Sequence, residues 1–231
     1  MSLLETAIGL LAPPQCINCN EEGSALCRQC SAVAIRPFGE RCWRCNSLSL
    51  NCRTCPKCRH LGGPHHVWIS TDHDNIARDL LSLYKFGHQR VAAEPIARLM
   101  SDTFLKFNPF ESTAGKEYLI VPIPTATSRS RARGFGHAEL LGRYIAANLK
   151  QERSDSLRRI GQSRQLGSAR EKRLRQLSSS FLVKNPYKIR GRNILIVDDV
   201  VTTGGTIISA TQTLLSAGAK QVDAILFAKR L

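Results

Sequence analysis

The chain has 231 residues, 42% of them hydrophobic, and its 33 basic and 18 acidic residues give a net charge of +15. This composition supports a folded core and argues against a disordered chain, and no apolar run approaches the roughly 18–20 residues that span a bilayer. The length suits one main domain plus a small module. The first residues include Glu5 and lack a basic n-region, so we expect a short helix ending at Pro13, not a signal peptide. We therefore expect a cytoplasmic protein with no membrane insertion and with reduced cysteines.

The positive charge is concentrated in one segment. Residues 129–192 hold 17 of the 33 basic residues and sum to +13, whereas 1–66, 67–128 and 193–231 sum to +3, −1 and 0. Such a concentration indicates a polyanionic partner, either a phosphorylated ligand or nucleic acid. The alternative is a solvated basic surface that aids solubility.

All nine cysteines lie within residues 16–58, mostly as C-x-x-C pairs, the spacing at which two thiolates of one turn reach one zinc ion. We expect one or two structural Zn²⁺ ions, with an Fe–S cluster as the lesser alternative. Cys52 is the surplus cysteine, and the expected ligands are Cys16, Cys19, Cys27, Cys30, Cys42, Cys45, Cys55 and Cys58. Sequential and interleaved pairing of the knuckles both remain open. His60, His65 and His66 follow the module, and we interpret them as linker residues, with His60 as a reserve metal ligand.

Gly62, Gly63 and Pro64 mark a break, so we place the zinc-binding module at 1–62 and the main domain at 63–231. A strand over 67–70 and helices over 76–84 and 91–107 come next. Lys85, at the end of the first helix, could reach a phosphate, although a solvated lysine is the default for that position.

A strand over 118–123 is followed by small hydroxyl residues and three arginines. The carboxyl end of a strand is where an α/β sheet places ligand groups. The guanidinium fork suits phosphate, so Arg129 and Arg133 are candidate phosphate ligands. A helix over 138–145 follows.

The basic segment over 150–192 contains four arginines that we assign to nucleic-acid binding: Arg164, Arg170, Arg173 and Arg175. Aromatic residues are nearly absent from it, which favours electrostatic, sequence-neutral binding of pyrophosphate or of a single-stranded backbone. The alternative is an exposed helix with a basic face.

The stretch 193–206, which opens with the apolar run 194–197, predicts a strand, a tight loop and a helix start. Free N–H groups at a helix N-terminus bind phosphate, and glycines let the backbone come close. Asp198 and Asp199 can accept hydrogen bonds from a ribose diol, and a neighbouring pyrophosphate would bring Mg²⁺. With strands at 118–123, 193–198 and 221–227 and helices between them, we expect a mainly parallel α/β sheet with helices on both faces.

The stretch 194–206 resembles the phosphoribosyl-pyrophosphate (PRPP) loop of type I phosphoribosyltransferases, with four apolar residues, two acids, two small apolar residues and T-T-G-G-T. The resemblance implies a phosphoribosyltransferase-like fold in which Asp198 and Asp199 contact ribose as the catalytic pair. It also implies that Val201, Thr202, Thr203, Gly204, Gly205 and Thr206 wrap the 5′-phosphate.

The order of motifs resembles the ComF family, which joins an N-terminal zinc ribbon to this fold. Three further motifs of the family occur in this sequence. The first is Tyr84-Lys85-Phe86, and the second is Val121-Pro122-Ile123-Pro124 followed by Arg129 and Arg133-Gly134-Phe135. The third is the loop sequence VDDVVTTG at 197–204. The resemblance implies PRPP binding, handling of incoming single-stranded DNA in natural competence, and a competence helicase as partner. Gly136-His137 replaces the family's usual Asn-Gln. Two alternatives are an active phosphoribosyltransferase acting on a base or amine, and a PRPP-sensing regulator bound to nucleic acid.

Overall fold

The computed structural model describes residues 13–86, 90–108, 117–124, 136–160 and 180–230. The expected N-terminal helix lies outside the described residues. So do the predicted phosphate ligands Arg129 and Arg133 and the predicted nucleic-acid ligands Arg164, Arg170, Arg173 and Arg175.

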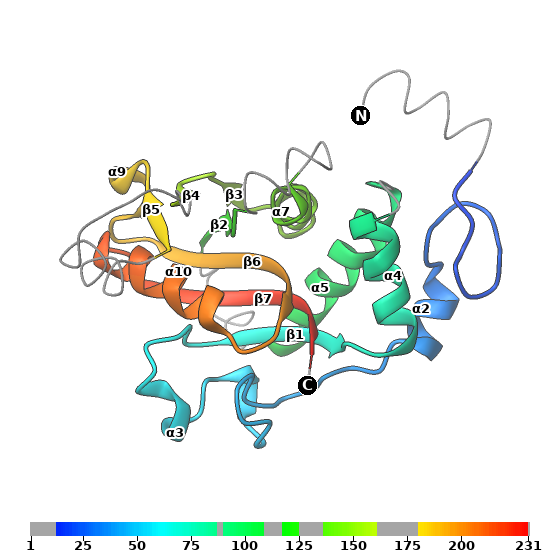
Figure 1. Cartoon of the computed structure of the whole chain (residues 1–231), viewed down its shortest axis with the longest axis horizontal. Coiled ribbons are helices and arrows are strands. Elements are labelled where there is room, and N and C mark those ends of the chain that lie inside the picture. Colours follow the sequence, from blue (N-terminus) through cyan, green and yellow to red (C-terminus); the bar gives the residue numbers. More distant parts are fainter. Residues whose placement is uncertain (1–12, 87–89, 109–116, 125–135, 161–179, 231) are drawn as a thin grey trace, which may run out of the picture.

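The centre of the molecule is a five-stranded sheet in the order β1-β7-β6-β2-β3, and all of its neighbouring strands pair in parallel (Figure 1). The strands are β1 (Val67–Asp72), β2 (Tyr118–Pro122), β3 (Glu152–Arg153), β6 (Asn193–Val201) and β7 (Gln221–Lys229). Each of the three central strands contains a continuous, buried apolar run, at 118–122, 194–197 and 224–228, as expected for a parallel sheet covered on both faces. The predicted parallel sheet is confirmed.

Helices cover both faces of the sheet, as predicted. One face carries α4 (Asn75–Phe86), α5 (Ala93–Phe107, after the 3₁₀ turn Arg90–Ala92) and α7 (His137–Leu149), and the other carries α10 (Gly205–Ser216). Each face has its own apolar core. Leu80, Ile96 and Leu141 pack in one core, and Ile207 and Leu214 pack in the other.

The strand that leads into the predicted loop extends further along the chain than the sequence predicted. The expected strand over 193–198 continues to Val201, because β6 still pairs with β7 at Val200 and Val201. Two β-branched valines favour this extended backbone. Both Asp198 and Asp199 therefore lie within the strand, and the turn begins after Val201.

The described ends of the basic segment form a two-stranded antiparallel ribbon and not a helix. β4 (Leu157–Arg159) pairs with β5 (Phe181–Val183), and the short helix α9 (Pro186–Ile189) follows. Leu157 and Phe181 are buried in the same core as α10, which anchors the ribbon to the sheet. The ribbon thus places Ile160 and Ser180 side by side, and the Ile160 N–H donates to the Ser180 carbonyl oxygen at 2.9 Å.

The cysteine-rich residues contain α2 (Arg28–Ala34), the 3₁₀ turn Leu50–Cys52 and α3 (Pro56–Arg59). These residues contribute side chains to both cores of the main domain. Leu26 packs in the core of α4 and α5, and Phe38 and Trp43 pack in the core of α10. In the described part of the chain, every helix is too short or too polar to cross a membrane.

Candidate functional site at the carboxyl ends of the strands

Two adjacent carboxylates lie near the carboxyl end of β6. The N–H of Asp199 donates to Asp198 Oδ1 at 2.9 Å, and Lys85 Nζ lies 2.9 Å from Asp199 Oδ2. Lys85 comes from the last turn of α4, so the predicted phosphate-binding lysine and the predicted ribose-binding acid form an ion pair. The side chains are only partly exposed, which strengthens the attraction relative to a surface pair.

Burial raises the pKa of Asp198 to about 8. The negative charge of Asp199 acts in the same direction, whereas the positive charges of Lys85 and Arg159 act in the opposite one. Near neutral pH the pair therefore holds a proton readily. A ligand that offers hydroxyl donors or a cation would favour the fully ionised pair.

Directly after β6, residues 202–206 turn from the strand into α10. Gly204 has φ +81°, in the left-handed region that favours glycine, and the helix starts at Gly205. Thr202, Thr203 and Gly205 are exposed. The first N–H groups of a helix have no intrahelical acceptor, so this turn offers several donors to an anion.

Two residues of the cysteine-rich segment support this loop, and sequence reasoning missed both of them. Arg44 Nη1 donates to the Thr203 carbonyl oxygen at 2.7 Å. The buried ring of Trp43 lies directly against Gly204. Only long-range contacts identify these two residues, because each lies far from the loop in sequence.

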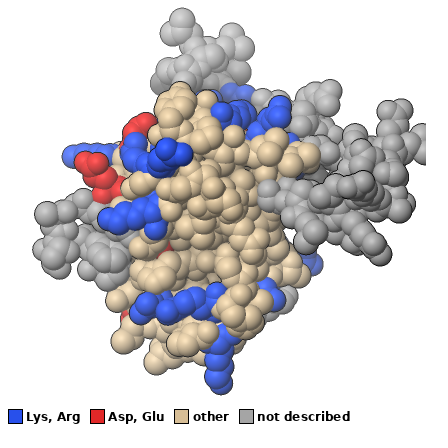
Figure 2. Space-filling model, turned by 90° about the vertical axis from the view of Figure 1, so that its left-hand side faces the viewer, with Lys and Arg blue, Asp and Glu red and all other residues tan. Residues whose placement is uncertain are grey.

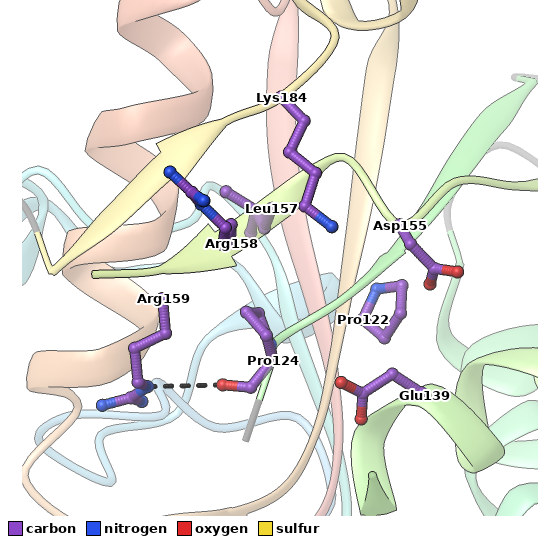
Figure 3. Close-up of a pocket in the computed structure, with 8 residues that line it drawn as sticks. All are labelled: Pro122, Pro124, Glu139, Asp155, Leu157, Arg158, Arg159 and Lys184. Atoms are coloured by element: carbon purple, nitrogen blue, oxygen red, sulfur yellow. Dashed lines mark hydrogen bonds between the residues drawn. The ribbon is translucent and has the colours of Figure 1, made fainter. Parts of the chain in front are cut away.

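A cleft of about 310 Å³ lies at the carboxyl end of β2, the strand that pairs with β6 (Figure 3). It is lined by Pro122, Pro124, Glu139, Asp155, Leu157, Arg158, Arg159 and Lys184. Arg159 Nε donates to the Pro124 carbonyl oxygen at 3.3 Å, and its guanidinium lies over the Phe181 ring. The cleft joins the end of β2 to the basic ribbon. Arg159 and Lys184 were therefore missed as site residues because only the fold brings them to that strand end.

The eight predicted metal ligands lie in two groups of four in sequential order. The first cluster is Cys16, Cys19, Cys27 and Cys30, and the second cluster is Cys42, Cys45, Cys55 and Cys58; within each group the sulfur atoms lie within 4.8 Å of one another. The Sγ atoms of Cys19 and Cys27 are 3.8 Å apart, and those of Cys45 and Cys55 are 3.6 Å apart. Four sulfurs at about 2.3 Å from a tetrahedral zinc ion would be about 3.8 Å apart.

These residues therefore fit two Cys₄ zinc sites, and the interleaved arrangement does not occur. Zinc bound there would cross-link the halves of each cluster. The surplus Cys52 belongs to neither group: it is buried in the core and points at the Gly39 carbonyl oxygen, and burial raises the pKa of its thiol to about 12.

His65 and His66 are not loose linker residues. The His66 N–H donates to Asp223 Oδ1 at 2.9 Å, and Tyr118 Oη donates to Asp223 Oδ2 at 2.7 Å. The amide of Gln221 donates to both carboxylate oxygens. This buried network joins β1, β2 and β7 at their amino ends, opposite the candidate site, so it holds the sheet together there.

The family departure at 136–137 has a structural role in this chain. His137 begins α7 and is buried, and its carbonyl oxygen accepts a hydrogen bond from Tyr84 Oη at 2.7 Å. The Tyr84 and His137 rings also meet edge to face. His137 thus helps fix α4, the helix that presents Lys85.

Comparisons with known proteins agree with this geometry. The model of the phosphoribosyl transferase domain matches residues 141–231, which include β6, the loop and α10. Competence protein ComFC of Streptococcus pneumoniae is 31% identical over 204 residues, 87% of this chain and 86% of that protein. Competence protein ComFC of Bacillus subtilis is 28% identical over 225 residues, which cover 88% of this chain and 89% of that protein. DNA utilization protein YhgH of Escherichia coli is 27% identical over 206 residues, which cover 86% of this chain and 87% of that protein. The chain therefore belongs to the ComFC family of phosphoribosyltransferase-like proteins.

Proposed function

We propose that the chain binds a phosphoribosyl ligand of the PRPP type at the carboxyl end of β6. The observation that carries this is the juxtaposition of Asp198 and Asp199 with the exposed turn at 202–206, where a diol and a phosphate could be bound side by side. The carboxylates would accept from the ribose hydroxyls, and the N–H groups at the start of α10 would donate to the 5′-phosphate.

The pyrophosphate of such a ligand would extend toward the cleft beside β2. Arg159 and Lys184 line that cleft and Lys85 lies at the carboxylates, so positive charge is available along this path. Mg²⁺ carried by the ligand would neutralise part of the pyrophosphate charge, held mostly by phosphate oxygens and water.

We further propose that the basic ribbon binds single-stranded DNA during uptake of DNA in natural competence. Two of the relatives are named competence proteins and another is named a DNA utilization protein. Figure 2 displays the face at the left of Figure 1, where Lys and Arg side chains are more prominent than Asp and Glu. Arg158, Lys184, Lys188 and Arg190 belong to the ribbon, its flanking residues and α9, and the arginines at 164, 170, 173 and 175 lie between the ribbon strands in sequence.

Calorimetric titration with Mg²⁺-PRPP tests the ligand. We expect binding by the wild type and an affinity loss of tenfold or more in Asp199→Asn. Asp102→Asn, an exposed acid of α5, is the matched control and should bind like the wild type. Equal affinities in all three proteins, or no binding at all, would sink the proposal.

Titration of a labelled single-stranded oligonucleotide across a salt series, with and without Mg²⁺-PRPP, tests the DNA role. We expect affinity that falls steeply with salt, because binding by basic side chains releases counterions. A change of the oligonucleotide affinity on adding Mg²⁺-PRPP would show that the DNA site and the phosphoribosyl site are coupled. No binding at moderate salt would refute the DNA role and leave ligand binding intact.

A second candidate is transfer of the phosphoribosyl group, which the cleft at the carboxyl end of β2 favours because it offers space for an acceptor. An acceptor nitrogen would bond to the anomeric carbon, pyrophosphate would leave with the electron pair, and the acceptor proton would pass to solvent. Positioning and charge stabilisation can carry such a reaction. Release of pyrophosphate in the presence of free bases would support it, and its absence with every base tried would count against it.

A further inference from the structure

The second cluster and the 202–206 loop share an interface through residues that lie between the metal-binding cysteines. Trp43 lies between Cys42 and Cys45, and its Nε1 donates to Thr54 Oγ1 at 3.0 Å. Thr54 in turn precedes Cys55 and donates to the Pro64 carbonyl oxygen at 2.5 Å. The position of the indole ring therefore depends on both halves of the second cluster.

That ring forms a wall of the loop. A Cβ atom added to Gly204 would overlap the Trp43 ring, so the backbone contacts the ring with no room for a side chain. Thr203 precedes Gly204 in the loop, and its carbonyl oxygen accepts a hydrogen bond from Arg44 Nη1 at 2.7 Å. Trp43 and Arg44, which lie between Cys42 and Cys45, thus contact Gly204 and Thr203 of the loop.

A third contact holds the strand that leads into the loop. Asn46, in the same turn as Cys45, accepts a hydrogen bond from Lys229 Nζ at the end of β7. Lys229 is the register partner of Val201, the last residue of β6 before the loop. The second cluster therefore supports both the loop and the strand end that precedes it.

The first cluster packs elsewhere. Cys16 and Leu26 belong to the core of α4 and α5, and the Leu26 carbonyl oxygen accepts from Arg98 Nη2 at 3.2 Å. In Figure 1 the chain of the first cluster lies beside α2 and α4, whereas the chain of the second lies below β1. The two clusters thus provide a matched pair for experiment.

We propose that the metal-bound second cluster positions the 202–206 loop, so that affinity for the phosphoribosyl ligand depends on metal at the second cluster and little on metal at the first. Trp43 and Arg44 are positioning residues in this view. A short segment without its own core loses its fold when its metal is removed. The 202–206 loop would then lose its contact with the Trp43 ring. The ligand would have to order the loop on binding, which would lower its affinity. The inference rests on the proposed function.

The first test compares Cys45→Ser with Cys19→Ser. Both cysteines are exposed, and each is the second cysteine of the first C-x-x-C pair in its cluster. Elemental analysis should find one zinc fewer in each variant. Titration with Mg²⁺-PRPP should show at least a tenfold loss in Cys45→Ser and less than twofold in Cys19→Ser. Equal losses, or no loss in either variant, would overturn the inference.

A second test leaves every cysteine in place, because Cys45→Ser could unfold its module. Arg44→Ala should keep the full zinc content and weaken Mg²⁺-PRPP binding about three- to tenfold, the effect of losing one exposed hydrogen bond. Arg44→Lys, which keeps one donor, should recover part of the affinity. Arg28→Ala, an exposed arginine on α2, should bind like the wild type. Wild-type affinity in Arg44→Ala would count against the inference.

Amide hydrogen exchange tests the role of the second cluster without any ligand. Amides of residues 202–208 should exchange faster in Cys45→Ser and Arg44→Ala than in Cys19→Ser and Arg28→Ala. If the wild type binds no PRPP, the proposed function fails while this comparison still decides whether the second cluster holds the loop. Equal exchange in all four variants would show that it does not.

Discussion

Lys85 Nζ lies 2.9 Å from Asp199 Oδ2, and this ion pair joins the last turn of α4 to the carboxyl end of β6. Both side chains are partly buried, at 25% and 15% exposure, so the lysine offsets one of two neighbouring negative charges where water screens them only in part. The protonation state of the carboxylate pair on β6 is therefore tied to a residue of α4.

Replacing Lys85 by Met should make the carboxylate pair hold its proton more tightly. The pKa of Asp198 should rise by about one unit or more, because an opposite charge at this range stabilises the ionised form. Carbon-13 NMR titration of the aspartate carboxyls would measure the shift. Lys106→Met, at an exposed position of α5, is the control, and identical titration curves in the two variants would contradict the prediction.

Asp198 should make the protein less stable as pH rises. Its pKa is raised from 3.8 to about 8, so the native state binds the proton more tightly than the unfolded state does. The free energy of unfolding should therefore fall as pH increases from about 4 to about 8. Asp198→Asn removes this dependence and should gain on the order of 1–3 kcal/mol over the wild type at pH 8, but little at pH 4. Urea unfolding at both pH values measures this, with Asp102→Asn as control; parallel profiles for the wild type and Asp198→Asn would refute it.

The network around Asp223 should contribute to stability and not to ligand binding. Tyr118→Phe removes a buried hydrogen bond of 2.7 Å to Asp223 and should lower the free energy of unfolding by about 1–2 kcal/mol. Asp223→Asn should lower it more, because the partners on β1, β2 and β7 lose a charged acceptor. Urea unfolding gives both values. Affinity of Tyr118→Phe for Mg²⁺-PRPP should equal that of the wild type, and a large loss would place this network in the site.

The wild type should contain two zinc ions per chain, one in each cluster. Cys27→Ser should contain one, and Cys52→Ser should keep two, since the Cys52 thiol lies in the core and its pKa is raised to about 12. Elemental analysis and the absorption of the cobalt-substituted protein count the sites. Loss of a metal ion in Cys52→Ser would show that Cys52 is a ligand.

Local sequence patterns predicted a large part of the fold and of the candidate site. Continuous apolar runs are typical of buried parallel strands, and the runs at 118–122 and 193–197 predicted the centre of the sheet. The C-x-x-C spacing predicted the eight cysteines that form two groups of four, because a pair of thiolates in one turn is a local arrangement. The carboxylates and the glycine turn were recognised for the same reason: each is a feature of a few consecutive residues.

The tertiary structure alone decided which distant residues meet. Arg44 reaches the Thr203 carbonyl oxygen and Lys85 reaches Asp199 only because parallel strands bring their carboxyl ends to one edge, where α4 and the second cluster also lie. The choice between sequential and interleaved cysteines likewise depended on three-dimensional packing. Spacing along a chain fixes the geometry of one turn, whereas contacts between separate elements depend on how their apolar faces are buried together, which no single stretch encodes.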